Sequence, residues 1–286
     1  MYTAQIQNMS GEVFMLTGNE AVYQVVSIIG LNPPKAQINT TTIFGLDGAL
    51  FNSSKLETRN IVLTIKINGN IETNRQNLYK YFPTKQWVRF YYTNQNRNVY
   101  IDGYVESVEC NIFDNGQKAQ ISILCPQPYF KSVDEIITDI SNTLAAFVFP
   151  FSINLNEPIP FSTFSSTMQA TVYNGSEGET GTIIEVDFQT AVEELLIRNT
   201  LTGDEFTLEY SFEQNDRVII NTNKGEKSVT LMRNGTATNL FSALQKGSVF
   251  FQLEAGDNYF VYLADDGDNN EFVFITFIHA DAYRGV

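Results

Sequence analysis

The alternation that decides the fold is clearest in residues 61–67, which read IVLTIKI. Every second residue in this run is a large apolar side chain, so one face of a strand can enter a core while the other meets solvent. Further strand-like stretches follow at residues 87–92, 98–109 and 119–124, and turn signals recur about every ten residues, as in sandwiches and barrels. These patterns predict an all-β chain.

Composition supports a packed, strand-rich chain. The 286 residues are 43% apolar and 17% charged, which permits one large all-β domain or two domains of ordinary size. The chain has 22 Phe and 14 Tyr, residue types that favour sheet faces, and one tryptophan, Trp87, which is expected in the core.

Net charge and hydropathy exclude several classes of partner. A formal charge of -14 disfavours general binding to nucleic acid and to anionic membranes. The N-terminus shows no basic and apolar signal pattern, and no apolar run approaches the length of a membrane span. We therefore expect synthesis in a cytosol, with neither nucleic acid nor membrane as a partner.

One short helix is expected between the strands. Thr73 and Gln76 form a Thr-x-x-Gln pattern that is typical of a capping box. Leu78, Tyr81 and Phe82 follow at helical spacing, and a proline stops the run. The pattern predicts about two helical turns that pack on the sheet.

The two cysteines flank an expected hairpin. If Asn115-Gly116 forms a two-residue type I′ turn, Cys110 faces Ile121 and Cys125 faces Glu106. The sulfurs are then roughly 13 Å apart along the ladder, too far for a disulfide. Both are expected to be free thiols.

A domain boundary is expected near residue 130, which divides the chain into residues 1–130 and 131–286. Two prolines at 126 and 128 cannot continue a central strand, and residues 131–144 could form a helix or an ordered linker. The second half shows strand-like stretches at 217–222, 228–232, 249–253, 259–263 and 272–278. Residues 189–197 are interpreted as a loop that runs into a strand.

Catalytic groups are scarce. His279, the only histidine, is expected at a strand end or on the surface rather than as a catalytic base. Glu193-Glu194 is interpreted as a solvated pair, and the run from Asp265 to Glu271 as an acidic hairpin tip without the spacing of a calcium loop. The sequence also lacks a Gly-rich phosphate motif. No catalytic residue, cofactor or metal is expected, and the chain is predicted not to be an enzyme.

An ordered set of short motifs runs through the first half, over roughly residues 20 to 130. The motifs are Gly30-Leu31-Asn32-Pro33-Pro34, Gly45-Leu46-Asp47-Gly48, Arg59-Asn60-Ile61, Arg75 with Leu78-Tyr79, Ile101-Asp102-Gly103-Tyr104-Val105-Glu106 and Cys125-Pro126-Gln127-Pro128-Tyr129-Phe130. In order and spacing this set resembles the distal tail protein family of siphophages. The second half is similar to the second domain of longer members through Phe149-Pro150-Phe151, Val218-Ile219-Ile220-Asn221-Thr222, Lys227-Ser228-Val229 and Tyr283-Arg284-Gly285-Val286.

The resemblance implies an architecture, a place and a set of partners. The first domain would be a β-sandwich or barrel-like ring-forming (belt) domain that makes a hexameric ring, and the second a galectin-like β-sandwich. The protein would be a structural hub at the phage tail tip, synthesised in the bacterial host cytoplasm. Its ring would join the major tail tube protein to the tail tip protein and to receptor-binding proteins.

Candidate assembly residues lie in the first half. Residues 30–48, rich in proline and glycine, predict a long structured excursion between strands, where partner contacts are common. For any single residue of this segment, an ordinary surface loop is the alternative interpretation. The candidates are Gly30, Pro33, Pro34, Asp47, Gly48, Arg59 and Asn60. Gly48 is expected to have a positive φ because Asp-Gly favours tight turns. A carbohydrate-binding adhesion module that aids attachment to the host surface is the alternative function.

Overall fold

The computed structural model describes residues 2–18, 22–45, 47–113, 116–140, 143–145, 162–164 and 169–286. The chain forms two compact units. Unit 1 comprises Met1–Asp134 together with Ala282–Val286, and unit 2 comprises Glu135–Asp281. The last residues of the chain therefore belong to the first unit.

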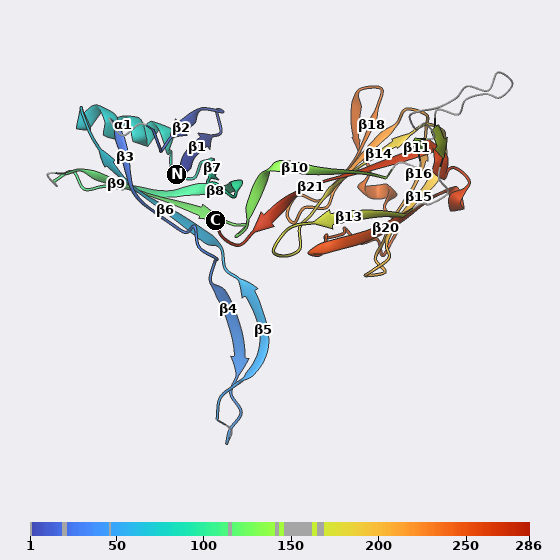
Figure 1. Cartoon of the computed structure of the whole chain (residues 1–286), viewed down its shortest axis with the longest axis horizontal. Coiled ribbons are helices and arrows are strands. Elements are labelled where there is room, and N and C mark those ends of the chain that lie inside the picture. The colour runs from blue at the N-terminus through green and yellow to red at the C-terminus, as the bar shows by residue number, and fades with distance from the viewer. Residues whose placement is uncertain are drawn as a thin grey trace, which may run out of the picture. The chain divides into compact units, whose positions relative to one another are not determined.

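Unit 1 is built from antiparallel strands and one helix (Figure 1). Hydrogen-bonded neighbours run in the order β2-β1-β7-β8-β9-β6-β3, and β10 also pairs with β8. Within the described residues, β4 pairs only with β5. The elements are β1 (Thr3–Asn8), β2 (Val13–Met15), β3 (Tyr23–Ile29), β4 (Ala36–Thr41), β5 (Leu50–Leu56), β6 (Arg59–Ile67), α1 (Ile71–Tyr81), β7 (Trp87–Thr93), β8 (Asn98–Cys110), β9 (Lys118–Cys125) and the start of β10 (Phe130–Ile140).

The core of unit 1 follows from the alternation in β6. Ile61, Leu63 and Ile65 are 0% exposed, and β6 is central because it pairs with β3 and β9. Leu78 and Phe82 join the same core from α1 and from the residue after it. The strand and the apolar face of the helix predicted from sequence are confirmed.

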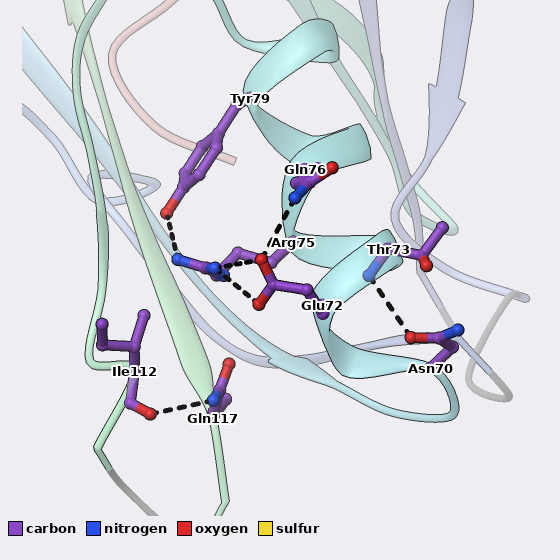
Figure 2. A network of polar contacts seen from close by, with 8 residues as sticks. All are labelled: Asn70, Glu72, Thr73, Arg75, Gln76, Tyr79, Ile112 and Gln117. Atoms are coloured by element: carbon purple, nitrogen blue, oxygen red, sulfur yellow. Dashed lines mark hydrogen bonds and ion pairs between the residues drawn. The ribbon is translucent and has the colours of Figure 1, made fainter.

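The helix begins earlier than its sequence pattern predicts. Its N-cap is Asn70, whose side chain accepts a hydrogen bond from the backbone N–H of Thr73, so the capping box at Thr73 is wrong (Figure 2). Gln76 instead donates to Glu72 inside the helix. With 11 residues, α1 has about three turns.

The β8–β9 hairpin differs from the predicted two-residue turn. Cys110 faces Ala119 rather than Ile121, and β8 ends at Cys110 while β9 begins at Lys118. The loop is therefore longer, and Gln117 closes it through a hydrogen bond to the carbonyl oxygen of Ile112 (Figure 2). Asp114 and Asn115 lie outside the described residues. Both cysteines are free, as predicted.

Unit 2 contains two principal antiparallel sheets (Figure 1). One has the order β19-β18-β17-β14-β21-β10 and the other β13-β20-β15-β16. The elements are β11 (Thr143–Ala145), β12 (Ser162–Phe164), β13 (Gln169–Asn174), β14 (Ile183–Phe188), β15 (Val192–Asn199), β16 (Glu205–Phe212), β17 (Arg217–Asn221), β18 (Ser228–Arg233), β19 (Thr236–Asn239), η1 (Phe241–Ala243), β20 (Gly256–Ala264), η2 (Asp265–Gly267), η3 (Asn270–Phe272) and β21 (Val273–Tyr283).

One core fills the space between the two sheets of unit 2, as in a β-sandwich. Phe188 and Phe212 stack with ring centroids 4.3 Å apart, and Phe260 lies 4.6 Å from Phe277 across the layers. The hairpin of β17 and β18 is confirmed, as is the loop that runs into β15. Residues 149–151, the predicted start of this domain, lie outside the described residues.

Two predictions about this part of the chain are wrong. Residues 130–140 form a strand rather than a helix or linker. Residues 249–253 are not a strand, because their backbone N–H groups do not bond to one neighbouring strand. The Val249 N–H donates to the carbonyl oxygen of Glu205, and the Leu253 N–H donates to that of Thr180. Among the described residues, no helix has the length and hydropathy needed to cross a membrane.

Candidate assembly site

Arg59 forms the best-connected polar junction of unit 1. Its side chain is 3% exposed at the start of β6. Nε donates to the carbonyl oxygen of Pro128 at 2.8 Å, and Nη1 donates to that of Asn32 at 2.7 Å and to that of Gly30. Nη2 donates to the carbonyl oxygen of Arg284. Burial lowers the pKa of Arg59, and these carbonyl dipoles replace the lost water.

The Arg59 guanidinium also lies over the Phe130 ring, 4.6 Å from its centroid. One side chain thereby joins the segment before β4, the proline segment after β9 and the C-terminal tail. This arrangement is structural, since the groups that hold the cation are backbone carbonyls and an aromatic ring.

Gly30 is fixed by a close approach of the backbone. Its φ is +99°, and a Cβ atom would lie 2.3 Å from the carbonyl oxygen of Asn60. Only glycine combines that conformation with that contact. Gly30 and Arg59, both predicted from sequence, therefore meet at one place.

Pro33 and the C-terminal tail lie against each other. A Cβ atom on Gly285 would be 3.0 Å from Cδ of Pro33, and the backbone N–H of Val286 donates to the carbonyl oxygen of Leu31 at 3.1 Å. Arg97 holds the tail through a hydrogen bond to the carbonyl oxygen of Gly285 and a cation–π contact at 4.1 Å with Tyr283. Pro34 is half-buried beside this contact.

Asn60 belongs to a separate polar cluster on the outward face. Its Nδ2 donates to Glu106 at 3.2 Å, and the Ser122 hydroxyl lies 3.0 Å from Asn60 Oδ1 and 2.8 Å from Glu106 Oε2. The cluster ties β6, β9 and β8 together across the sheet.

Asp47 and Gly48 lie at the tip of the β4–β5 ribbon, away from the Arg59 junction at its base (Figure 1). Both are exposed, and Gly48 has φ +88°, which confirms the expected positive φ. The structure therefore separates the candidates into residues that fix the base of the ribbon and residues that form its tip.

The sequence analysis missed the apolar side chains of the ribbon. Ile38 is 62% exposed, Leu50 56%, Phe51 65% and Phe44 105%. A usable signal was present, since the turn-forming Phe44-Gly45 and Asp47-Gly48 separate two runs of β-branched and apolar residues.

A second outward surface lies on β7 and β8. Arg89 makes a bidentate pair with Asp102 at 2.7 and 2.9 Å, and its guanidinium lies 4.1 Å from the centroid of the Tyr100 ring and 5.4 Å from that of Trp87. Trp87 is half-buried here, so its expected core position is wrong. The same face carries Tyr104, which is 49% exposed opposite Trp87.

His279 is buried within β21, so its predicted strand-end or surface position is wrong. It is 3% exposed. Burial lowers its pKa, and the nearby Asp281 charge opposes that shift. The groups around His279 belong to the β-sandwich of unit 2, so its position is that of a core residue.

The acidic run after β20 braces the sheet instead of forming only a solvated tip. Asp265 Oδ1 accepts hydrogen bonds from the backbone N–H groups of Glu193 and Glu194 at 2.8 and 3.0 Å. Asn270 is 6% exposed and accepts from the Ala264 N–H. Within the described ranges, no group of three or more His, Cys, Asp or Glu residues could hold a metal ion.

Two family models match the chain. The model described as a phage tail protein RIFT-related domain matches residues 18–125, in unit 1. The model described as the C-terminal domain of a siphovirus-type tail component matches residues 175–278, in unit 2. Together they span more than half of the chain. None of the curated proteins compared with the chain matches it.

Solved structures share the fold over almost the whole length. The Dit protein (gp 19.1) of phage SPP1, described as a paradigm of the hub adsorption apparatus in phages that infect Gram-positive hosts, has a TM-score of 0.70 at 15% identity, covering 98% of this chain and 99% of that one. A chain of the phage p2 baseplate in its activated conformation with Sr has a TM-score of 0.58 at 13% identity, covering 98% of both chains. A chain of that baseplate with Ca has a TM-score of 0.55 at 14% identity, again with 98% of both chains covered.

At these identities the structural likeness shows a common fold alone. The family models show which class of protein the chain belongs to. Both units are matched in chain order by models of phage tail components. The chain belongs to the siphovirus-type tail components, the distal tail protein family of siphophages, and is a structural protein of the phage distal tail.

Proposed function

We propose that this protein is the hub at the end of the phage tail, where unit 1 associates with copies of itself into a sixfold ring. The ring joins the major tail tube protein to the tail tip protein. Unit 2, a galectin-like sandwich, carries contacts to receptor-binding proteins. The protein acts through these contacts and catalyses no reaction.

The observation that carries the proposal is the distribution of apolar side chains in unit 1. Large exposed apolar residues lie on its ribbon, at both ends of β1, on β2 and on the β8–β9 loop, where Phe113 is 90% exposed. An aromatic and arginine face of the kind enriched at protein interfaces accompanies them on β7 and β8. Such surfaces are costly in a monomer and favour association.

Several arginine side chains are already paired with groups of the same chain. Arg59 and Arg97 bind backbone carbonyl oxygens, Arg89 pairs with Asp102, and Arg233 donates to Asp216, which is 2% exposed. Because these charged groups are paired within the chain, exposed apolar and aromatic side chains remain as the groups that can make contacts. This supports an assembly role over a reaction centre.

Negative-stain microscopy and native mass spectrometry of the purified full chain test the proposal over a wide concentration range. The expected result is a closed ring of six copies that forms as concentration rises. A monomer at every concentration, in a preparation whose circular dichroism shows folded β structure, would contradict the ring. A ring of another number would revise the symmetry alone.

A further inference from the structure

The β4–β5 ribbon has two chemically different faces. Residues opposite each other in the pairing share a face, and the register pairs Ala36 with Leu56, Ile38 with Ser54 and Thr40 with Phe51. The irregularity between Asn39 and Thr40 keeps these pairs on one side. Four of the six residues on this face are apolar, namely Ala36, Ile38, Phe51 and Leu56, and Ser54 and Thr40 lie between them.

The opposite face carries a polar ladder, with exposed Leu50 paired to Thr41 at the end nearest the tip. Asn39 Nδ2 donates to Ser53 Oγ at 3.0 Å, and Asn52 Nδ2 donates to Thr41 Oγ1 at 2.7 Å. These bonds hold the two strands in register without a core. The ribbon is therefore a preformed amphipathic arm with its polar side already satisfied.

The apolar face has no cover in the described parts of the chain. Every residue of β4 is exposed, and so is every residue of β5 except Leu56. An isolated two-stranded ribbon is marginally stable in water, and one that also exposes apolar residues gains stability when another surface covers it.

Charge favours a second copy of this chain as the cover. Two copies that each carry a formal charge of -14 repel one another in general. Residues 36–56 contain Asp47 and Lys55 as their only charged residues, so the arm is neutral. The arm is thus a part of the molecule that can approach a like-charged copy without this repulsion.

The surface that could receive the arm, called the seat, is the open edge of β2 at the other end of the unit 1 strand order, with Met9, Val13 and Met15. β2 pairs with β1, and no strand in the described residues pairs with its second edge. Met9 is 69% exposed beside it, and Val13 and Met15 on β2 are 46% and 44% exposed. This open edge with apolar side chains offers both backbone hydrogen bonds and an apolar surface to an incoming ribbon.

We propose that the apolar face of the β4–β5 arm, centred on Ile38 and Phe51, docks on the β2 edge at Met9, Val13 and Met15 of the next copy. The inference rests on the self-association in the proposed function and names the contact that makes it. Because arm and seat are different surfaces, the interface is heterologous, and repeating it with a rotation that closes on itself gives the ring of the proposed function.

Matched variants of the full chain test the contact. Phe51→Asp places a charge on the apolar face, while Ser53→Asp places the same charge two residues away on the polar face. Both positions are exposed, so both variants should fold like the wild type by circular dichroism and thermal melting. Phe51→Asp should raise the dissociation constant of assembly at least about tenfold, as for the loss of a central interface residue, and Ser53→Asp should leave it within about twofold.

Complementation tests the direction of the contact. Met15→Asp should block the seat as Phe51→Asp blocks the arm, so each variant alone should stay monomeric. A mixture of the two keeps one intact arm and one intact seat, and native mass spectrometry should detect heterodimers that grow no further. Heterodimers support the head-to-tail contact, whereas a mixture that stays monomeric overturns it.

The outcomes separate this inference from the proposed function. A wild type that never associates overturns the ring itself. If the wild type assembles and the Phe51→Asp variant assembles equally well, the arm contact is overturned and the ring stands. Equal loss of assembly in Phe51→Asp and Ser53→Asp, or arm amides that exchange hydrogen equally fast in ring and monomer, would also overturn the contact.

Discussion

Arg59 shows how one residue can fix several segments that are distant in sequence. Its guanidinium reaches carbonyl oxygens at Gly30, Asn32, Pro128 and Arg284. The fork geometry of arginine suits such convergent acceptors, and a lysine ammonium cannot reproduce it. The base of the arm and the C-terminal tail thus depend on the same side chain.

Arg59→Lys should lower the free energy of unfolding by about 2–4 kcal/mol, because buried carbonyl groups lose their donors. Urea denaturation of the full chain measures the change. Arg198→Lys is the control, since Arg198 pairs with Glu205 while both side chains are about half exposed, and it should cost less than about 1 kcal/mol. Equal losses in the two variants would contradict the role given to Arg59.

Gly30→Ala should be among the most damaging small substitutions in unit 1, at more than about 3 kcal/mol. It combines a positive φ with a Cβ position that overlaps the backbone of Asn60. Gly45→Ala separates the two effects, because its φ is +84° and nothing lies within 4 Å of the added Cβ, so about 1–2 kcal/mol is expected there. Similar midpoints of urea unfolding for both variants would refute the close-approach argument.

His279 should make stability depend on pH. Burial lowers its pKa from the usual 6.5, so the unfolded chain takes up a proton at a higher pH than the folded chain does. The stabilising effect of the neutral ring is present above pH 6.5 and is lost as pH falls from there toward the folded pKa. Urea midpoints from pH 8 to 5 should fall less steeply in His279→Gln than in the wild type, and parallel profiles would contradict this.

Local signals in the sequence predicted residues whose constraint is local. Asp-Gly at 47–48 predicted the positive φ of Gly48, which the structure confirms. The contact between Arg59 and Arg284 spans 225 residues, so no local pattern reveals it. His279 was misplaced for a related reason, since its burial depends on the packing of the whole sandwich.

Among the elements, α1 shows how two capping signals compete. Asn70 and Thr73 are both good N-cap residues, and the structure uses Asn70, with Glu72 and Arg75 paired at 2.6 Å in the first turns (Figure 2). The earlier start lets Ile71 pack against the core of unit 1. A sequence pattern alone does not weigh that packing.

Asn70→Ala should therefore lower the free energy of unfolding by about 1 kcal/mol, through loss of the side-chain acceptor at the N-cap. Thr73→Ala keeps that acceptor and the Thr73 N–H that it binds, so it should change stability by less than about 0.5 kcal/mol. Thermal melting of the two variants side by side measures the difference. A larger loss for Thr73→Ala would restore the capping box at Thr73.

Strand alternation predicted the core strands, but it did not fix their register. The shift between Val105 and Ser107 in β8 moves the hairpin pairing relative to a simple turn, and a bulge leaves little trace in a period-two pattern. β10 was missed because its outward side chains are polar or exposed, so alternation is weak there. The arm was foreseen only as a structured excursion, since its strands have no core to impose alternation.

In the whole molecule, each unit has a hydrophobic core of its own, and each is matched by a different family model. The boundary expected from the prolines lies at residue 130, and the compact units divide at residues 134 and 135. The sequence assigned residues 283–286 to the second domain, whereas Ala282–Val286 packs in unit 1. Tail residues carry few local constraints, and the donors that hold them, Arg59 and Arg97, lie far away in sequence.

As a structural part of the distal tail, this protein should occupy one place in the virion. Gold labelling with antibodies against the chain, viewed by electron microscopy on the phage particles that carry it, shows that place. Label confined to the distal end of the tail, where the tube meets the tip, is the expected result. Label spread along the tube, label on the capsid or particles without label would contradict a structural role in the distal tail.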